Sequence, residues 1–300
     1  MTVRARQASA LDDGPDQRWP DGAELVQRCH AWTGYRSGMS GDEGVGEIPG
    51  PPELPGDPSS DYGARVEAAF LGALAGEHAA QAPAAAGDLL EVADSIATVG
   101  GFDADDLRRR GLVGSSQAGP AGLLLRAVPF ALLAPLDRPR IRRDAYRVAA
   151  LAGADEGTAI AAMAAALLAA DLTRFDPATA VVRVYQSLLE DAPFALLERL
   201  RPGEGPPPSE ADDDPGAALQ LAMAAVLGAG EIAAAIAAAL APGRRAAVSL
   251  AGALAGAHLG GAGLDAAWRA AVPHAQRAVT LAAAVAARAA DLAAASPAPG

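Results

Sequence analysis

Along most of the chain after residue 63, apolar residues recur every three to four positions, which is the spacing of one face of an α-helix. Proline and glycine interrupt the pattern at short intervals, for example at Gly100-Gly101 and across the polar segment Pro202–Pro215. We expect that segment to be a solvated insertion and the chain after about Ala293 to fray. The pattern predicts an all-α fold, a single compact helical domain, with helices over residues 64–80, 86–99, 103–111, 120–134, 141–153, 157–173, 178–190, 193–200, 216–228, 230–241, 244–260, 265–271 and 275–294.

One short sequence occurs twice. Gly72-Ala-Leu-Ala-Gly-Glu-His78 near the start of the helical region returns as Gly252-Ala-Leu-Ala-Gly-Ala-His258 near its end. Glycines four residues apart remove the side chains from one stripe of a helix, so that a second backbone can approach closely. Since a glycine within a helix costs about 1 kcal/mol relative to alanine, the paired glycines indicate a packing requirement. We therefore expect two central helices that cross in the core.

Residues 1–62 differ from the rest of the chain. They contain eleven acids and five arginines, and the run Gly46-Glu-Ile-Pro-Gly-Pro-Pro-Glu-Leu-Pro-Gly56 is incompatible with a helix or a strand. Two interpretations remain open: an intrinsically disordered N-terminus, or a segment that docks on a partner. We divide the chain into an acidic Pro/Gly-rich arm, residues 1–62, and an all-α domain, residues 63–300.

The composition narrows the functional classes. A net charge of −12 argues against a nucleic-acid partner, which requires clustered positive charge. Cys29 is the only cysteine, which excludes an intramolecular disulfide and fits a reducing compartment, and the first thirty residues have no apolar signal region, so we expect a cytoplasmic protein. The long apolar stretches Ala217–Leu240 and Ala246–Leu264 are rich in Ala and Gly and contain Glu231 or His258. We interpret them as buried helices of a soluble protein, with no membrane partner.

Four segments, in order, resemble the ADP-ribosylglycohydrolase family over roughly residues 64–272: Phe70-Leu-Gly-Ala-Leu-Ala-Gly-Glu77, Gly100-Gly-Phe-Asp103, Leu123-Leu-Leu-Arg-Ala-Val-Pro129, and Ala247–Gly261 followed by Ala267-Trp268. The resemblance implies a compact all-α domain. It also implies hydrolysis of a glycosidic bond of ADP-ribose, usually with two Mg²⁺ or Mn²⁺ ions. In the family these metals are held by a Thr-Asp-Asp-Thr motif and a Gly-Gly-Asp-x-Asp-Thr motif, because hard dications take oxygen ligands.

This sequence departs from the family at both metal-binding motifs. The position of the second motif reads Ala241-Pro-Gly-Arg-Arg-Ala246, so that Gly243 and Arg245 stand where aspartates are expected, and the position of the first reads Pro83-Ala-Ala-Ala86. Adjacent arginines would repel a dication. Two further family patterns are also changed, to Pro120-Ala-Gly122 and Ala152-Gly153.

Four residues are candidates for binding a ligand in a residual pocket: Glu77, Arg126, Arg244 and Arg245. Glu77 stands where the opening helix of the family ends in an acid, and Arg126 matches a family arginine that also has a structural interpretation. Arg244 and Arg245 could hold an anion such as a pyrophosphate at a helix N-terminus, or they could lie at the surface or pair with Glu77.

Other chemistry has weaker support in the sequence. We interpret Asp88, Glu91 and Asp94, which recur at helical spacing, as a solvated helix face. Other polar residues have no evident partners for a metal site or a serine hydrolase, namely His78, His258, His274, Ser115, Ser116 and Ser249.

We therefore predict a catalytically inactive relative, a pseudoenzyme without metal or cofactor, that binds a protein partner or associates with itself. The alternative is a metal-independent hydrolase or binder of ADP-ribose-like ligands that uses Glu77 and the arginines. An open polar cleft near Glu77, Arg126 and Arg245 would favour the alternative, whereas a filled apolar one would favour the pseudoenzyme.

Overall fold

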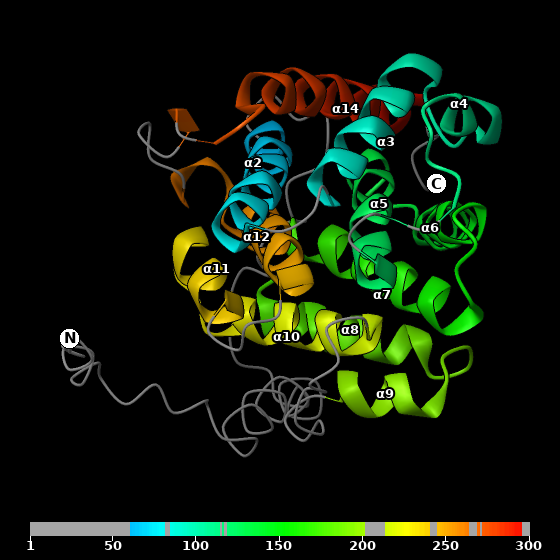
Figure 1. Ribbon diagram of the computed structural model, residues 1–300, viewed down its shortest axis with the longest axis vertical. Coiled ribbons are helices and arrows are strands. Elements are labelled where there is room, and N and C mark those ends of the chain that lie inside the picture. The colour runs from blue at the N-terminus through cyan, green and yellow to red at the C-terminus, as the bar shows by residue number, and fades with distance from the viewer. Residues whose placement is uncertain are drawn as a thin grey trace, which may run out of the picture.

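The computed structural model describes residues 61–81, 85–114, 116, 119–201, 214–240, 245–263, 269–270 and 272–295, except the side chains of residues 245, 246, 262 and 263. Within these ranges the regular structure is helical and there is no strand, which confirms the all-α fold class (Figure 1). The N-terminal arm and most of the helix expected over residues 265–271 lie outside the described residues. The α-helices are α2 (Tyr62–Ala80), α3 (Ala85–Val99), α4 (Ala104–Arg109), α5 (Gly119–Leu133), α6 (Arg138–Leu151), α7 (Glu156–Leu172), α8 (Pro177–Leu188), α9 (Phe194–Leu200), α10 (Pro215–Leu227), α11 (Ile232–Leu240), α12 (Arg245–Leu259) and α14 (Ala275–Ala295), and a 3-10 turn, η1, spans Gly260–Gly263.

Aspartate side chains begin several of these helices by accepting hydrogen bonds from free backbone N–H groups of the first turn. The aspartates are Asp103, Asp137, Asp155, Asp176 and Asp214, which precede α4, α6, α7, α8 and α10. The prediction that α6 starts at residue 141 is wrong by three residues. A proline is tolerated in the first turn of a helix, so α6 begins before Pro139 rather than after it.

The crossing of α2 and α12 lies at the centre of the molecule and confirms the interpretation of the repeated glycines (Figure 1). A Cβ atom added to Gly72 would lie 2.1 Å from the carbonyl oxygen of Gly252. One added to Gly256 would lie 2.1 Å from the carbonyl oxygen of Ala68. The two backbones therefore touch directly, and no residue larger than glycine fits at these positions without separating the helices.

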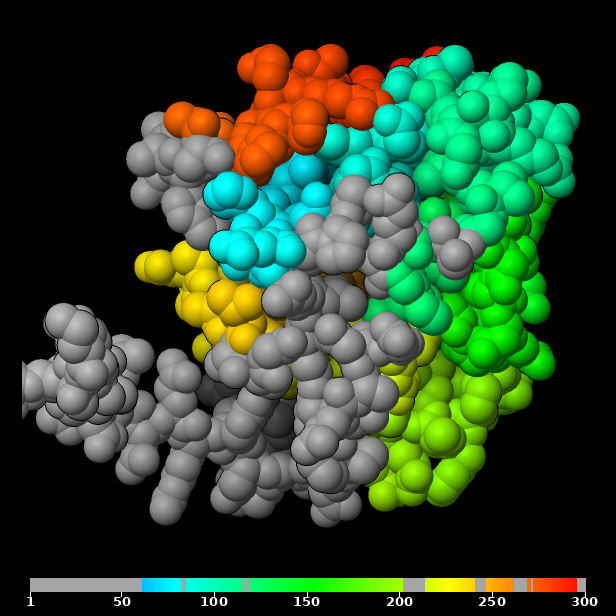
Figure 2. Space-filling view, in the orientation of Figure 1, coloured from blue at the N-terminus to red at the C-terminus, as the bar shows by residue number. Residues whose placement is uncertain are grey.

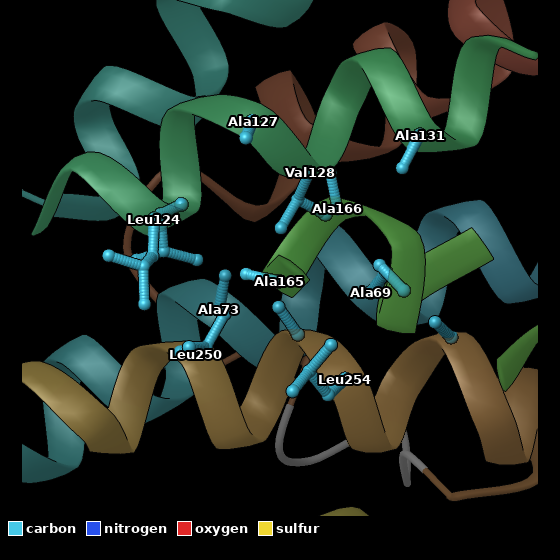
Figure 3. Packing of buried hydrophobic residues seen from close by; sticks show 14 of the residues in the cluster. Ala69, Ala73, Leu124, Ala127, Val128, Ala131, Ala165, Ala166, Leu250 and Leu254 are labelled. Carbon is cyan, nitrogen blue, oxygen red and sulfur yellow. The ribbon is translucent and has the colours of Figure 1, made fainter. Parts of the chain in front are cut away.

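Helices α5 and α7 pack against each other and against α12. Val128 of α5 lies next to Ala166 of α7, and Leu124 of α5 points toward α12, where Leu250 and Leu254 face the same interior (Figure 3). These side chains are at most 1% exposed. Many of the core positions are alanines, so the helices lie close together and the core is built from short contacts rather than large aromatic rings.

Among the described helices, one, α14, is long and apolar enough to cross a membrane by length and composition. It packs on α2, α3 and α5 with the buried residues Ala278, Leu281, Ala282, Val285 and Ala289. Figure 2 shows α14 next to α3 and α4 on one face of the molecule. Packing against the protein core accounts for the apolar face of α14. The apolar stretch 217–240 is divided between the shorter helices α10 and α11.

Candidate pocket at the end of helix α2

A pocket of about 330 Å³ lies where α2 ends and α14 begins. Its lining is Leu74, Glu77, His78, Gln81, Pro273 and His274. The first four residues come from α2 and its C-terminal turn, and the last two come from the turn before α14. The pocket beside Glu77 is lined by both polar and apolar side chains, and Arg126 is not among them, so the arrangement on which the alternative function depends is present only in part.

Two of these residues have an unusual backbone conformation. Gln81 has φ of 48° and His274 has φ of 60°, so both lie in the left-handed region. Gln81 ends α2, and its N–H is directed at the carbonyl oxygens of Glu77 and His78. For residues other than glycine the left-handed region costs on the order of 1 kcal/mol, and such strain often accompanies functional sites. The two described non-glycine residues with positive φ line one pocket, which supports a role for it in binding.

The carboxylate of Glu77 is half-buried and accepts a hydrogen bond from the first turn of the next helix, α3. Its Oε2 atom accepts a hydrogen bond of 2.6 Å from the backbone N–H of Ala86, in the first turn of α3. Burial raises the pKa of Glu77 above its ordinary value of 4.5, and the charge of Asp88 adds to the rise, while the N–H of Ala86 and the charge of His274 lower it. The net direction is upward, so this group holds a proton more readily than an exposed glutamate.

The residues at the first metal-binding motif do not fit a pair of dications. In the described part of this motif the side chains are the methyl groups of Ala85 and Ala86, which are 2% and 0% exposed. Glu77 is already bonded to the backbone there. A search of the described residues finds no group of three His, Cys, Asp or Glu side chains that could hold a metal. Mg²⁺ and Mn²⁺ sites of this kind need several oxygen ligands, which this donor set does not supply.

Arg126 is placed in the interior rather than in the pocket. Its residue is 2% exposed, and its guanidinium donates to Oδ2 of Asp88 at 2.8 Å and to the carbonyl oxygens of Leu112 and Gly114 at 3.0 and 3.3 Å. Asp88 also accepts a hydrogen bond from the hydroxyl of Ser116. Arg126 thus ties α5 to α3 and to the loop before α5. Asp88 connects it electrostatically to Glu77, because Asp88 forms an ion pair with Arg126 and its charge also raises the pKa of Glu77.

The remaining candidates are only partly within the described structure. Arg244 lies outside the described residues, and Arg245 begins α12 with a side chain that is not described. Of the acids on α3, Glu91 and Asp94 form ion pairs with Arg110 and Arg277 at the junction of α3, α4 and α14, so their side chains serve packing at the surface.

The histidines separate into two groups. His78 and His274 line the pocket, whereas His258 is half-buried at the end of α12 with its Nδ1 atom buried and without a hydrogen-bond partner among the described residues. Burial lowers the pKa of His258. Sequence reasoning treated His274 as isolated, because nothing in the sequence indicates that the turn Pro273-His274 reaches the end of α2.

The fold and the pocket define a class of protein: an all-α domain with a ligand-sized pocket at the end of its first described helix. The family model described as ADP-ribosylglycohydrolase matches residues 7–296, and the chain belongs to this family. The match begins at residue 7 and so includes most of the N-terminal arm. A solved structure described as an "ADP-ribosylglycohydrolase-related protein complex" superposes with a TM-score of 0.62 at 20% identity, over 76% of this chain and 99% of that chain, and is similar to this chain in fold. A comparison with curated protein sequences gives no match.

Proposed function

We propose that this chain is a pseudoenzyme of its family, a binding protein that does not carry out metal-dependent hydrolysis of ADP-ribosyl bonds. The observation that carries the proposal is the donor set at the start of α3. Of this motif, Ala85 stands in place of an aspartate and Ala86 in place of a threonine; both are buried, and the nearby carboxylate of Glu77 accepts a hydrogen bond from the N–H of Ala86. The sequence of the second motif supports the proposal, because Gly243 and Arg245 stand in place of its two aspartates.

The loss of the metals removes most of the chemistry that the reaction needs. A metal pair positions the sugar hydroxyls and lowers the pKa of a bound water, which supplies several kcal/mol of transition-state stabilisation. Glu77 alone, with a raised pKa, can exchange a proton but cannot replace two positive charges at the reacting sugar.

A hydrolysis assay tests the proposal. Purified full-length protein is incubated with ADP-ribosylated peptide in 5 mM EDTA and, separately, in millimolar Mg²⁺ or Mn²⁺, beside a family member whose two acidic motifs are intact. We expect release of ADP-ribose by that control enzyme alone. Metal-dependent release by this chain would refute the proposal.

A second candidate function is favoured by the pocket itself: binding of an ADP-ribose-like ligand without metal. Glu77 and His78 offer hydrogen-bonding groups beside the apolar side chain of Leu74, and the strained Gln81 and His274 hold the rim in place. The replacement Glu77→Gln tests it, because glutamine keeps the shape of the side chain and removes its charge. Binding of ADP-ribose that weakens in this variant would support the candidate, and undetectable binding by the parent chain would exclude it.

We also propose that the chain binds a protein partner or a second copy of itself. We expect it to do so in the cytoplasm. Two large apolar side chains at the turn between α8 and α9, Leu189 and Phe194, are 52% and 74% exposed. Exposed aromatic anchors of this kind are common in interfaces. Sedimentation analysis of the parent chain and of Phe194→Ser, with Leu136→Ser as a control at another exposed apolar position, measures whether the chain self-associates through this turn.

A further inference from the structure

Helix α6 concentrates positive charge in an acidic protein. Five of the 24 arginines lie within its fourteen residues, in a chain of net charge −12. Arg138 and Arg142 are neutralised by Asp171 and Asp191 on one side of the helix. The other three arginines, Arg140, Arg143 and Arg147, follow the i, i+3, i+7 spacing of one helix face and converge on the single carboxylate of Asp144.

The cluster of Arg140, Arg143, Arg147 and Asp144 leaves guanidinium groups without hydrogen-bond acceptors among the described residues. Asp144 has a side chain that is 3% exposed and accepts hydrogen bonds of 2.8 and 3.2 Å from Arg143. Arg140 and Arg147 approach the same carboxylate only to 3.7 and 3.9 Å. The Nε atom of Arg140 is buried with no hydrogen-bond partner in the part of the chain that the structure describes, and no described residue accepts a hydrogen bond from the guanidinium of Arg147.

The three arginines line one cavity of about 240 Å³ together with Val99, Gly100, Gly101, Phe102, Asp103 and Asp144. The guanidinium of Arg147 lies over the ring of Phe102, 4.1 Å from its centre, which fixes the arginine by a cation–π contact. Gly101 makes room for Arg140, because a Cβ atom at residue 101 would lie 3.1 Å from the Nη2 atom of that arginine. Asp103 is occupied as the N-cap of α4.

The cavity is remote from the pocket beside Glu77. Glu77 contacts the first turn of α3, whereas Gly100 and Gly101 follow the last turn of that helix. Fifteen helical residues separate the two ends, which corresponds to about 22 Å. The arginine cavity is therefore a second site and not an extension of the first.

We propose that this cavity binds a small phosphorylated ligand through Arg140, Arg143 and Arg147. Buried Asp144 gathers the three guanidinium groups, and the carboxylates of Asp144 and Asp103 together leave one net positive charge in the cavity for the oxygens of an incoming anion. Guanidinium groups bind phosphate oxygens in pairs, and the unfilled donors of Arg140 and Arg147 supply such a fork. Because the anion also relieves the repulsion among the arginines, its binding stabilises the folded protein.

Calorimetric titration of the full chain with inorganic pyrophosphate tests the proposal, using the parent, the double variant Arg140→Gln/Arg147→Gln and the control Arg142→Gln. The control removes a charge from the same helix on the face that pairs with Asp191. We expect about one pyrophosphate per chain, an affinity at least about tenfold weaker in the double variant, and a change below about threefold in the control. A single variant, Arg147→Gln, repeats the test at a half-exposed position, in case the double variant does not fold.

Each other outcome overturns the proposal. No binding by the parent chain removes the site. Equal weakening in the double variant and in Arg142→Gln shows a diffuse effect of net charge rather than a defined cavity. Loss of pyrophosphate binding in Glu77→Gln, with the arginine variants unaffected, places the anion in the other pocket. Since the probe contains no ribose, failure here leaves the proposed function untouched.

Discussion

Replacement of Gly252 by alanine tests the direct backbone contact between helices α2 and α12. The added Cβ atom would lie 2.0 Å from the carbonyl oxygen and 2.7 Å from the carbonyl carbon of Gly72, both of them backbone atoms that cannot rotate away. Helices α2 and α12 must therefore move apart by more than 1 Å, which opens gaps among the buried alanines around the crossing. Overpacking of this kind costs about 3 kcal/mol, and the better helix propensity of alanine offsets about 1 kcal/mol. We expect a net loss of about 2 kcal/mol in the free energy of unfolding.

Urea denaturation followed by circular dichroism at 222 nm measures this loss, and Gly63→Ala is the matched control. Gly63 lies in the first turn of α2, and no atom is within 4 Å of the position of its added Cβ. The gain in helix propensity acts there without a clash, so we expect the control to be as stable as the parent or more stable by up to about 1 kcal/mol. If Gly252→Ala is as stable as the control, the close approach of the two helices is not required, and the interpretation of the repeated glycines is refuted.

Three further predictions follow from the site. Because burial raises the pKa of Glu77, the folded state binds the proton of this carboxyl group more tightly than the unfolded state does. The stability of the parent relative to Glu77→Gln is therefore greatest below pH 4.5 and falls as the pH rises through the folded pKa. A difference in urea midpoints that rises between pH 4 and 7 would contradict this. Arg126→Met leaves the carboxylate of Asp88 and the carbonyl oxygens of Leu112 and Gly114 without their partner and should cost about 3 kcal/mol in the same urea assay, whereas a ligand-binding arginine would lose binding with little loss of stability. Mg²⁺ at 10 mM should leave the melting temperature unchanged to within about 1 °C beyond the effect of ionic strength matched with NaCl, since a bound ion would stabilise the folded state by mass action.

The helices and their central crossing could be predicted because they depend on local and repeated signals. Glycines at residues 72, 76, 252 and 256 indicate two helices in direct contact, and the structure places their backbones together. The start of a helix is harder to predict where an aspartate cap is followed closely by a proline. At Asp137-Arg138-Pro139 the predicted start at residue 141 is too late, because the N–H groups of the first turn have no acceptor within the helix and a proline there loses no hydrogen bond.

The site could be predicted only in part, because its geometry depends on long-range packing. Sequence reasoning identified Glu77 as a residue that faces a pocket, and the structure places it there. Arg126 carries the family resemblance but lies in a buried ion pair with Asp88, which the sequence had indicated only as part of a solvated helix face. The left-handed conformation of Gln81 has no sequence signal, and histidine, although it is enriched in that region, is not specific enough to predict the conformation of His274.

Calorimetric titration of the full chain with ADP-ribose, in the presence and absence of Mg²⁺, tests most directly the central claim that this family member works without the metal pair. Because the described side chains at the start of α3, Ala85 and Ala86, offer no oxygen ligand, we expect the titration curve with 10 mM Mg²⁺ to be the same as the curve in EDTA, whatever the affinity. Binding of ADP-ribose that appears or strengthens about tenfold or more when Mg²⁺ is added would contradict the claim.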